Sequence, residues 1–263
     1  MWIVHDVNDV HNVSGNSEFL FSDKRFFSVD LNMCGRKTLT RDMQSIIVEL
    51  AIDDWQDDDF YPSYNIAPTQ SSPILIGDGS SRIVRSMKWG LIPSWSKDES
   101  IGSKMINARS ETLHEKPSFQ NLIHQNRCVI IADGYFEWKR DSEGSQPFYI
   151  FHLENKLLPM AGLWTSWKSS ASQIINSYTV ITTSPKKEIR HIHNRMPAIL
   201  NPMSIDEWIH CEKTPSGQAL TNLVPTPKPL AFHPVSTFVN SPKNNSIDCI
   251  RSIRDSSTLG LFN

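Results

Sequence analysis

The fold is decided by residues 128–139, CVIIADGYFEWK, where two short apolar runs meet at Asp133-Gly134. Short runs of β-branched and aromatic residues bounded by Gly or Asp indicate strands, so strands are predicted at Cys128–Ala132 and Gly134–Lys139. The same signals predict further strands at Phe148–His152, Pro159–Trp164, Tyr178–Thr183 and Met196–Leu200. Many short strands with few helices indicate a single α+β domain around a curved, barrel-like, mostly antiparallel sheet flanked by a few helices.

Upstream and downstream elements complete this expectation. A helix capped by Thr40 is predicted by apolar residues at helical spacing: Met43, Ile46, Ile47, Leu50 and Ala51. A second helix is expected over residues 111–124, with Pro117 in its first turn or breaking it. A third is expected over 204–210, where Ser204 and Glu207 have capping-box spacing. Strands at 73–76 and 83–89 flank a turn, residues 64–69 form a loop, and residues 225–245 are mostly loop or edge strand.

Composition limits the classes of function. The chain has 263 residues, 39% of them hydrophobic and 21% charged, which is ordinary globular usage. No apolar run is long enough to cross a bilayer, and the first residues lack the pattern of a secretory signal, so a cytoplasmic protein without membrane contact is expected, nucleoid-associated if bacterial. The four cysteines show no CxxC spacing, so neither a metal site, a disulfide framework nor a cofactor is predicted.

Residues 1–32 differ in character from the rest, being rich in Asn, Asp and Ser without sustained periodicity. They are interpreted as a segment upstream of the true translation start or as a removable leader; an N-terminal strand packed on the domain is the alternative. The expected domain spans residues 33–250, followed by a tail at 251–263. The first 32 residues hold two basic and five acidic side chains, so the net charge of −2 becomes +1 for residues 33–263, and any nucleic-acid surface must be local.

The pair Met33-Cys34 offers an unusual chemistry. If Met33 is the initiator and is removed, Cys34 carries a free α-amine beside its thiol, with ordinary pKa values of about 7.7–8.0 and about 8.5. Together these groups can condense with an aldehyde to a five-membered thiazolidine, which an internal cysteine cannot form. From this pair alone, a buried core thiol is the alternative.

Several short motifs occur in a fixed order along the chain. They are MCGR (33–36), NIAPT (65–69), WGLIPSW (89–95), INARSET (106–112), ADGYFEW (132–138), IHNRMP (192–197) and HPVS (233–236) with Val239-Asn240. Each is weak alone, but together, from Met33 to about Cys249, they resemble the SRAP family (SOS response-associated peptidase-like proteins, including bacterial and animal abasic-site shields).

The resemblance implies residue roles. Cys34 corresponds to the residue that becomes N-terminal and forms a thiazolidine with the ring-opened deoxyribose of an abasic site. Asn107, Glu137 and His193 match the other active-site positions of the family, and Arg36 and Arg109 match positions that hold the DNA backbone. The extension before Met33 departs from the family pattern, since members normally begin at the Met-Cys pair.

The residue types agree with these roles, although each has a structural alternative. A histidine such as His193 can shuttle protons to open a closed hemiacetal, or it can serve as a hydrogen-bonded structural residue. Glu137, between aromatic residues, is either a carboxyl with a raised pKa or a glutamate on the solvated face of a strand. Asn107 either fixes the substrate or caps the following helix.

The sequence also contains candidate side chains for DNA contacts. Arg36, Arg109 and Arg195 are candidates for phosphate contacts, with solvated or paired arginines as the alternative. Of Trp89, Trp95 and Trp138, Trp95 or a neighbour is expected to be exposed for base stacking.

Three functions are therefore compared. The first is covalent capture of abasic sites in single-stranded DNA by a monomer, with possible reversal and a weak lyase activity. The second is a cysteine-dependent peptidase or autopeptidase that uses Cys34 as its nucleophile. The third is a non-catalytic module that binds single-stranded DNA.

Overall fold

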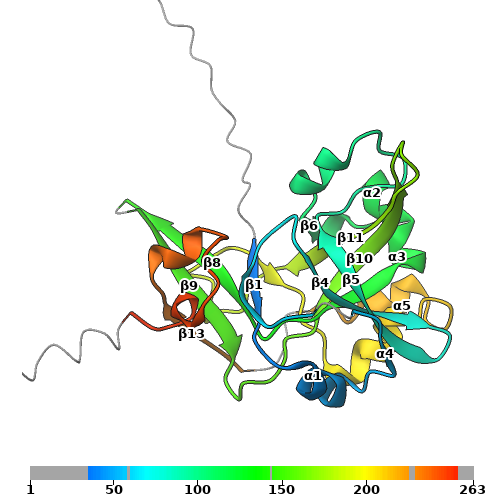
Figure 1. The fold of residues 1–263 in the computed structure, drawn as a ribbon. Coiled ribbons are helices and arrows are strands. Elements are labelled where there is room, and N and C mark those ends of the chain that lie inside the picture. Colours follow the sequence, from blue (N-terminus) through cyan, green and yellow to red (C-terminus); the bar gives the residue numbers. More distant parts are fainter. Residues whose placement is uncertain (1–34, 58–59, 143, 225–228, 254–263) are drawn as a thin grey trace, which may run out of the picture. The chain divides into compact units, whose positions relative to one another are not determined.

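Two β-sheets organise the computed structural model, which describes residues 35–57, 60–142, 144–224 and 229–253 (Figure 1). The first, called the flanking sheet, has the strand order β13-β9-β8-β1-β3. Its strands are β13 (Leu230–Pro234), β9 (Gly144–His152), β8 (Gly134–Asp141), β1 (Arg36–Leu39) and β3 (Ser63–Ile66). All of its neighbouring strands are antiparallel, and β1 lies between β8 and β3.

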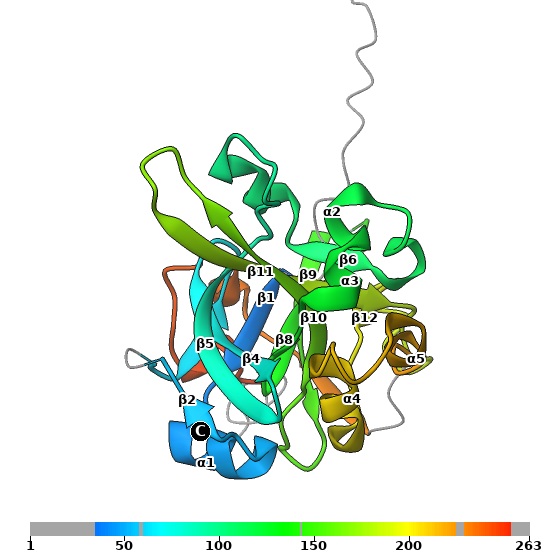
Figure 2. The same cartoon turned by 90° about the vertical axis from the view of Figure 1, so that its right-hand side faces the viewer.

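The second sheet closes into a five-stranded barrel (Figure 2). Its strands are β11 (Ile174–Thr183), β10 (Met160–Lys168), β7 (Arg127–Ile130), β4 (Ser71–Asp78) and β5 (Ser81–Trp89). Neighbours in this order are antiparallel, and a short parallel pairing of Ser177 with Lys88 and Tyr178 with Trp89 joins β11 back to β5. The predicted α+β fold with a barrel-like, mostly antiparallel sheet is therefore confirmed.

Three short strands extend the barrel: β2 (Asp54–Trp55) beside β5, and β6 (Asn107–Arg109) and β12 (Met196–Pro197) beside β11. The remaining elements are α1 (Met43–Leu50), η1 (Glu99–Lys104), η2 (Ser110–Thr112), α2 (Pro117–Gln120), α3 (Leu122–Gln125), η3 (Pro202–Ser204), α4 (Ile205–Ile209), α5 (Ser216–Leu220), η4 (Thr237–Asn240) and η5 (Ile247–Cys249). Among the described residues no helix is long and apolar enough to span a bilayer.

Close packing of the barrel depends on Gly162 of β10. A Cβ at this position would lie 2.2 Å from Cδ1 of Ile130 and 2.7 Å from the carbonyl oxygen of Thr179, so only glycine lets β10 pass between its neighbours. Buried aliphatic side chains of β4, β5, β7, β10 and β11 fill the interior and continue under α3 and α4. The buried Arg127 of β7 donates to the carbonyl oxygens of Ile123 and Thr214, which fastens the helical segments to the barrel.

One predicted helix start is wrong, and another is confirmed in position but lacks its predicted hydrogen bonds. The N-cap of α1 is Asp42, whose Oδ1 accepts from the N–H of Ser45 at 2.9 Å, because Thr40 is engaged with Asp133 instead. Ser204 makes no capping hydrogen bond to α4, because it belongs to the 3₁₀ turn η3 that precedes this helix. The capping box predicted with Glu207 is therefore absent.

Other boundaries differ in instructive ways. The helix expected over residues 111–124 is divided into η2, α2 and α3, and Pro117 begins α2 at its first position. The strand expected at 196–200 is reduced to β12 and an isolated bridge of Ile199 with Met160. Residues 63–66, expected in part as loop, form β3, whereas β13 is an edge strand as predicted.

Candidate active site

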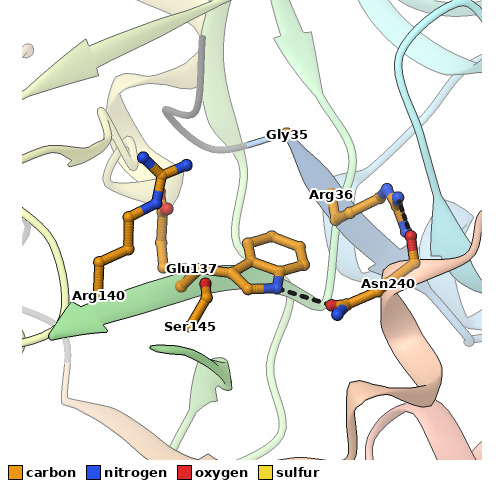
Figure 3. A pocket seen from close by; sticks show the side chains of 7 residues that line it. Gly35, Arg36, Glu137, Arg140, Ser145 and Asn240 are labelled. Carbon is orange, nitrogen blue, oxygen red and sulfur yellow. Dashed lines mark hydrogen bonds between the residues drawn. The ribbon is translucent and has the colours of Figure 1, made fainter. Parts of the chain in front are cut away.

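A pocket of about 290 Å³ opens where β1, β8 and β9 of the flanking sheet meet the segment around η4 (Figure 3). Its lining residues are Gly35, Arg36, Glu137, Trp138, Arg140, Ser145 and Asn240. Four of the seven come from the MCGR and ADGYFEW motifs: Gly35, Arg36, Glu137 and Trp138. Motifs about 100 residues apart in the sequence therefore share one cavity.

Strand register brings Gly35 and Glu137 together. Arg36 pairs with Phe136 and Lys37 with Tyr135 across β1 and β8, so continuing the same antiparallel register sets Gly35 opposite Glu137. Cys34 itself lies outside the described residues. It is joined by a peptide bond to Gly35, which lines the pocket.

Glu137 is 2% exposed, so the alternative of a glutamate on the solvated face is wrong. Its partner on β9 is Phe148, and cross-strand partners project from the same face of a sheet. This face packs into the main hydrophobic core, which includes Tyr135 and Ile150. The carboxyl group thus lies at the border between an apolar interior and the pocket.

Trp138 projects from the opposite face of β8, as the alternation of a strand requires. Its indole Nε1–H donates to Oδ1 of Asn240 at 2.8 Å, the contact drawn in Figure 3. This bond fixes the plane of the ring and ties η4 to the pocket.

Arg36 is held by the protein itself. Its Nη1 donates to Oδ1 of Asn65 at 2.8 Å and to the carbonyl oxygen of Val239 at 2.7 Å, and its Nη2 donates to the carbonyl oxygen of Asn240 at 2.9 Å. Burial lowers the pKa of the Arg36 guanidinium from its ordinary value, against an opposing influence of Cys249. The side chain predicted to hold DNA therefore also fastens β1 to η4.

Asn65, from the NIAPT motif, completes this connection. It is 1% exposed, and its Nδ2 lies within hydrogen-bond distance of the carbonyl oxygens of Val239, Ser241 and Asn244, the shortest at 2.7 Å. One amide thus joins β3, β1 and the segment that follows η4.

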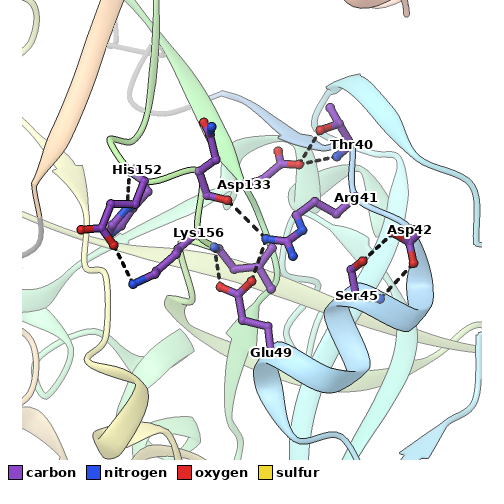
Figure 4. A network of polar contacts seen from close by, with 11 residues as sticks. Thr40, Arg41, Asp42, Ser45, Glu49, Asp133, His152 and Lys156 are labelled. Carbon is purple, nitrogen blue, oxygen red and sulfur yellow. Dashed lines mark hydrogen bonds and ion pairs between the residues drawn. The ribbon is translucent and has the colours of Figure 1, made fainter.

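Asp133 anchors the other end of β1 (Figure 4). Its Oδ1 accepts from the hydroxyl of Thr38 at 2.5 Å, and its Oδ2 accepts from the backbone N–H and the hydroxyl of Thr40. The Thr38 hydroxyl also lies 3.1 Å from the hydroxyl of Tyr149. Burial, with the nearby Asp133 charge, raises the pKa of Tyr149, so this phenol stays neutral.

His193 lies in the loop between β11 and β12, where Arg195 provides partners for its ring. The Arg195 backbone N–H donates to Nδ1 at 3.2 Å, which suits neutral imidazole with its proton on Nε2. The Arg195 carbonyl oxygen lies 3.3 Å from the same Nδ1, and can accept from it when the ring is protonated. Both charge states of His193 therefore have a backbone partner.

The Arg195 side chain is engaged as well. Its Nη1 and Nη2 donate to the two carboxylate oxygens of Glu111 at 2.7 and 2.9 Å, and Nη2 donates to the carbonyl oxygen of Thr182 at 2.5 Å. Hydrogen bonding from Arg195, more than its charge, lowers the pKa of Glu111.

Asn107 begins β6 and pairs with Val180 of β11 in parallel. Asn107 is half-buried and lies in a strand, so it does not take the alternative role of capping the following helix. Arg109, at the other end of β6, is exposed and makes no hydrogen bond or ion pair with the described residues.

The tryptophans divide as expected. Trp95 is 60% exposed in the loop after β5, whereas Trp89 is buried, donates to the carbonyl oxygen of Ile106 and stacks on Tyr178. Trp95 is not among the lining residues of the pocket.

Arg36 and Glu137 line the pocket, while Asn107 and His193 lie on elements beside β11. The ring of His191, two residues before His193, packs edge-on against Phe148, the cross-strand partner of Glu137, with centroids 6.5 Å apart, so the His193 loop lies against β9. No group of three His, Cys, Asp or Glu side chains in the described ranges is arranged to hold a metal ion.

Sequence reasoning missed the residues that support these positions. Asn65, Asp133 and Glu111 lie within the motifs NIAPT, ADGYFEW and INARSET, and this location is the sequence signal that points to them. Their partners lie 29 to 179 residues away, so the sequence alone does not pair them.

The barrel with its flanking sheet is a known fold. It matches a crystal structure of a protein from Bacteroides thetaiotaomicron with a TM-score of 0.74 at 24% identity, covering 83% of this chain and 99% of that one. A Bordetella bronchiseptica protein matches with a TM-score of 0.66 at 24% identity, covering 77% and 100%.

The family profile described as SOS response associated peptidase (SRAP) matches residues 33–242, and the chain belongs to this family. Among its relatives, it is 41% identical over 223 residues to the abasic site processing protein YoqW of Bacillus subtilis, covering 84% of this chain and 100% of that protein. It is 34% identical to the abasic site processing protein HMCES of Gallus gallus, covering 73% and 66%.

Proposed function

We propose that this protein captures abasic sites in single-stranded DNA through a covalent bond to Cys34 and so shields the lesion during the response to DNA damage. The observation that carries the proposal is the pocket shared by Gly35, the residue bonded to Cys34, and the buried carboxyl of Glu137. Relatives named abasic site processing proteins support the choice of substrate.

The chemistry requires a free amine on Cys34. The α-amine attacks C1′ of the ring-opened deoxyribose, the carbinolamine loses water to give an imine, and the thiol adds to the imine carbon. The net reaction forms one C–N and one C–S bond, closes a thiazolidine and releases one water. Both nucleophiles have deprotonated fractions near neutral pH.

His193 and Glu137 are assigned the proton transfers. A neutral His193 with its proton on Nε2 is a donor for the ring oxygen of the closed sugar, and its backbone contacts to Arg195 accommodate the charge change. Glu137 is suited to move protons at the amine and the carbinolamine, because a carboxyl bordering an apolar core can exist in either protonation state. Asn107 is assigned to orient the sugar through its amide.

Binding is proposed to use a local surface. Trp95 offers an exposed ring for stacking on an unpaired base, and Arg109 offers an exposed guanidinium for a phosphate. Arg36 is a weaker candidate for direct contact, because Asn65, Val239 and Asn240 occupy its donors. A single strand suits this arrangement, since an absent base lets the sugar reach a pocket.

Residues 1–33 must be removed for this reaction, because an internal Cys34 has an amide nitrogen. We propose that they are an upstream segment or a leader, and that the functional domain is 33–250 with a tail after it. An autopeptidase that uses the Cys34 thiol is the second candidate; the family description and the residues before Cys34 favour it. A lyase side reaction, in which the imine eliminates the 3′ phosphate before the thiol adds, is a third feature to test.

The decisive experiment compares the full chain, the chain beginning at Met33, and Cys34→Ala in both. Each is incubated with single-stranded DNA carrying one enzymatically excised uracil and resolved on a denaturing gel. Cys34→Ser is the matched control, since it keeps the amine but cannot form the thiazolidine sulfur bond. Intact mass shows which N-terminus each protein has.

The proposal expects a shifted covalent band only from protein whose first residue is Cys34. A band from protein that retains residues 1–33 would overturn the proposed ring chemistry. Processing that persists in Cys34→Ala would assign the cleavage to another agent, such as methionine aminopeptidase acting at Met33 in the chain that begins there. A shortened DNA fragment would report the lyase reaction. DNA binding without any covalent band would leave only a binding module.

A further inference from the structure

The outer half of the β10–β11 hairpin is buried on one face only. β7 pairs with β10 over residues 160–163, so among the described strands only β11 pairs with residues 164–168. In this part Thr165 and Trp167 are each 7% exposed, whereas Ser166 and Lys168 are exposed, which is the alternation of a strand with one covered face. Trp167 is not part of the main hydrophobic core of the described residues, so a neighbouring segment covers it.

The segment on this face carries Trp95. Residues 93–96 form a β-turn in which the N–H of Ser96 donates to the carbonyl oxygen of Pro93 at 2.9 Å, and Trp95 occupies the third position of the turn. The carbonyl oxygen of Ser96 accepts from the indole Nε1–H of Trp167 at 2.8 Å. The turn is therefore fastened to the hairpin directly after the exposed ring.

A second hydrogen bond fastens the turn from the other side. The N–H of Ile92 donates to Oγ of Ser177 at 2.9 Å, and this bond is buried. Ser177 is the cross-strand partner of Thr165, so its side chain projects from the same face of the hairpin as Thr165 and Trp167. One face of the hairpin thus holds the Trp95 turn both before and after the ring.

We propose that Trp167 and Ser177 are positioning residues that hold Trp95 in place to stack on an unpaired base of single-stranded DNA. The inference rests on the proposed function, in which the Trp95 ring, 60% exposed, supplies the stacking surface. A ring on a turn that is already fixed loses little conformational freedom on binding, so more of the stacking energy is realised as affinity. Trp167 itself is too buried to stack on a base, and its N–H is bonded to the protein.

The test measures binding of the full chain to intact single-stranded DNA, which needs no free amine on Cys34. The variants are Trp167→Phe, Ser177→Ala, Trp95→Ala and the double variant of Trp95→Ala with Trp167→Phe. Trp167→Phe keeps an aromatic ring and removes the N–H that holds Ser96. The readouts are the Kd from fluorescence anisotropy, its dependence on salt, and urea unfolding of each variant.

The matched control is Trp55→Phe. Trp55 lies in β2, and its indole Nε1–H donates to the carbonyl oxygen of Asp57 at 2.9 Å. This control therefore loses the same type of hydrogen bond from another element, and any shared loss of stability is measured without a change in the Trp95 turn.

A positioning role predicts a loss of affinity that depends on Trp95. Trp167→Phe and Ser177→Ala should each raise the Kd about two- to tenfold, the effect of one net hydrogen bond. Neither should exceed the effect of Trp95→Ala, because positioning can remove only what the ring contributes. In the Trp95→Ala background Trp167→Phe should cause no further loss, and Trp55→Phe should bind as the wild type does. The salt slope should stay unchanged, because stacking releases no counterions.

Other outcomes overturn the inference. If Trp167→Phe and Ser177→Ala bind as the wild type while Trp95→Ala binds weakly, the two hydrogen bonds contribute to stability alone. A further loss on Trp167→Phe in the Trp95→Ala background would mean that Trp167 acts on DNA binding independently of Trp95. If Trp167→Phe does not fold, Ser177→Ala decides the question in the same cycle with Trp95→Ala.

The proposed function fails by different results. A wild-type Kd that Trp95→Ala leaves unchanged would remove the stacking role of Trp95, and the inference with it. Absence of a covalent band from protein that begins at Cys34 would overturn the proposed capture of abasic sites, whereas the Kd values for intact DNA would still decide whether Trp167 and Ser177 position Trp95.

Discussion

Replacing Asn65 by alanine should reduce the free energy of unfolding by about 3 kcal/mol. The side chain has two N–H donors, shared among the carbonyl oxygens of Val239, Ser241 and Asn244, and one oxygen that accepts from Arg36. Three such hydrogen bonds contribute about 0.5–1.5 kcal/mol each, and the site is 1% exposed, so water cannot replace them without rearrangement. A loss of this size is a large part of the usual stability of a domain.

Urea unfolding followed by tryptophan fluorescence measures the change. The matched control is Asn121→Ala, because Asn121 is exposed and its side chain makes no capping hydrogen bond, so its effect should stay within about 0.5 kcal/mol. Asn65→Asp tests the donor side of the amide alone. It keeps the oxygen that accepts from Arg36 but replaces the Nδ2 donors with an oxygen that faces three carbonyl groups.

The reasoning also predicts coupling between Asn65 and Arg36. A double-mutant cycle with Asn65→Ala and Arg36→Lys should give an interaction energy of about 0.5–3 kcal/mol, as is usual for residues in one network. If Asn65→Ala matches the Asn121→Ala control, or if the two changes are additive, the amide does not hold β1 to the segment after η4.

Further outcomes follow from the geometry and can be checked separately. Gly90→Ala should destabilise the protein by about 2 kcal/mol or more in thermal or urea unfolding. Gly90 has a φ of +119°, and a Cβ there would lie 2.5 Å from the carbonyl oxygen of Gly102. The control Gly217→Ala should not destabilise the protein, because a Cβ at Gly217 would meet no atom within 4 Å. Trp95→Ala should weaken binding to intact single-stranded DNA by about 1–3 kcal/mol in fluorescence anisotropy with little change in stability, since its ring is 60% exposed. Arg195 lowers the pKa of Glu111 in the folded protein, so the ion pair stabilises the fold at pH values above the unfolded pKa near 4.5, and this stabilisation is lost as the pH falls through the lowered pKa. The free energies of urea unfolding of wild type and Glu111→Gln should therefore differ by at most about 1 kcal/mol at pH 7 and become equal in acid.

The sequence predicted the barrel because its strands are short, continuous apolar runs. Cys128–Ala132 and Tyr178–Thr183 were expected within a few residues of β7 and β11, since strands buried on both faces need no alternation to be recognised. It did not predict β1, whose four residues Arg-Lys-Thr-Leu contain two charges. Lys37 is fully buried, and its Nζ donates to the carbonyl oxygen of Ile131, a contact between residues 94 positions apart.

The candidate site was predictable to a similar degree. Motif order identified Glu137 and the neighbourhood of Cys34, and the structure brings Gly35 and Glu137 to one pocket. The sequence did not show which arginines contact DNA and which bind oxygens of the protein, because an arginine looks the same in the sequence whether its guanidinium binds a phosphate or a protein carbonyl. Arg36 and Arg195 were both proposed as DNA contacts, yet both donate to protein oxygens, whereas Arg109 is exposed. Whether Arg36 also touches DNA stays a prediction.

The scattered motifs have a common physical purpose that follows from where β1 lies. The ends of chains usually fray, so a reactive group at an N-terminus needs its strand held by contacts from elsewhere. Arg36 is bound by Asn65 and the 239–240 segment, Lys37 by Ile131, and Thr38 and Thr40 by Asp133. In addition, β8 pairs with residues 36–38 and β3 pairs with residues 37 and 39, so β1 is held by a strand on either side. Under the proposed removal of residues 1–33, the motifs at 65–69, 132–138 and 239–240 would meet one requirement: a chain end beginning at Cys34 would start from a fixed strand beside Glu137.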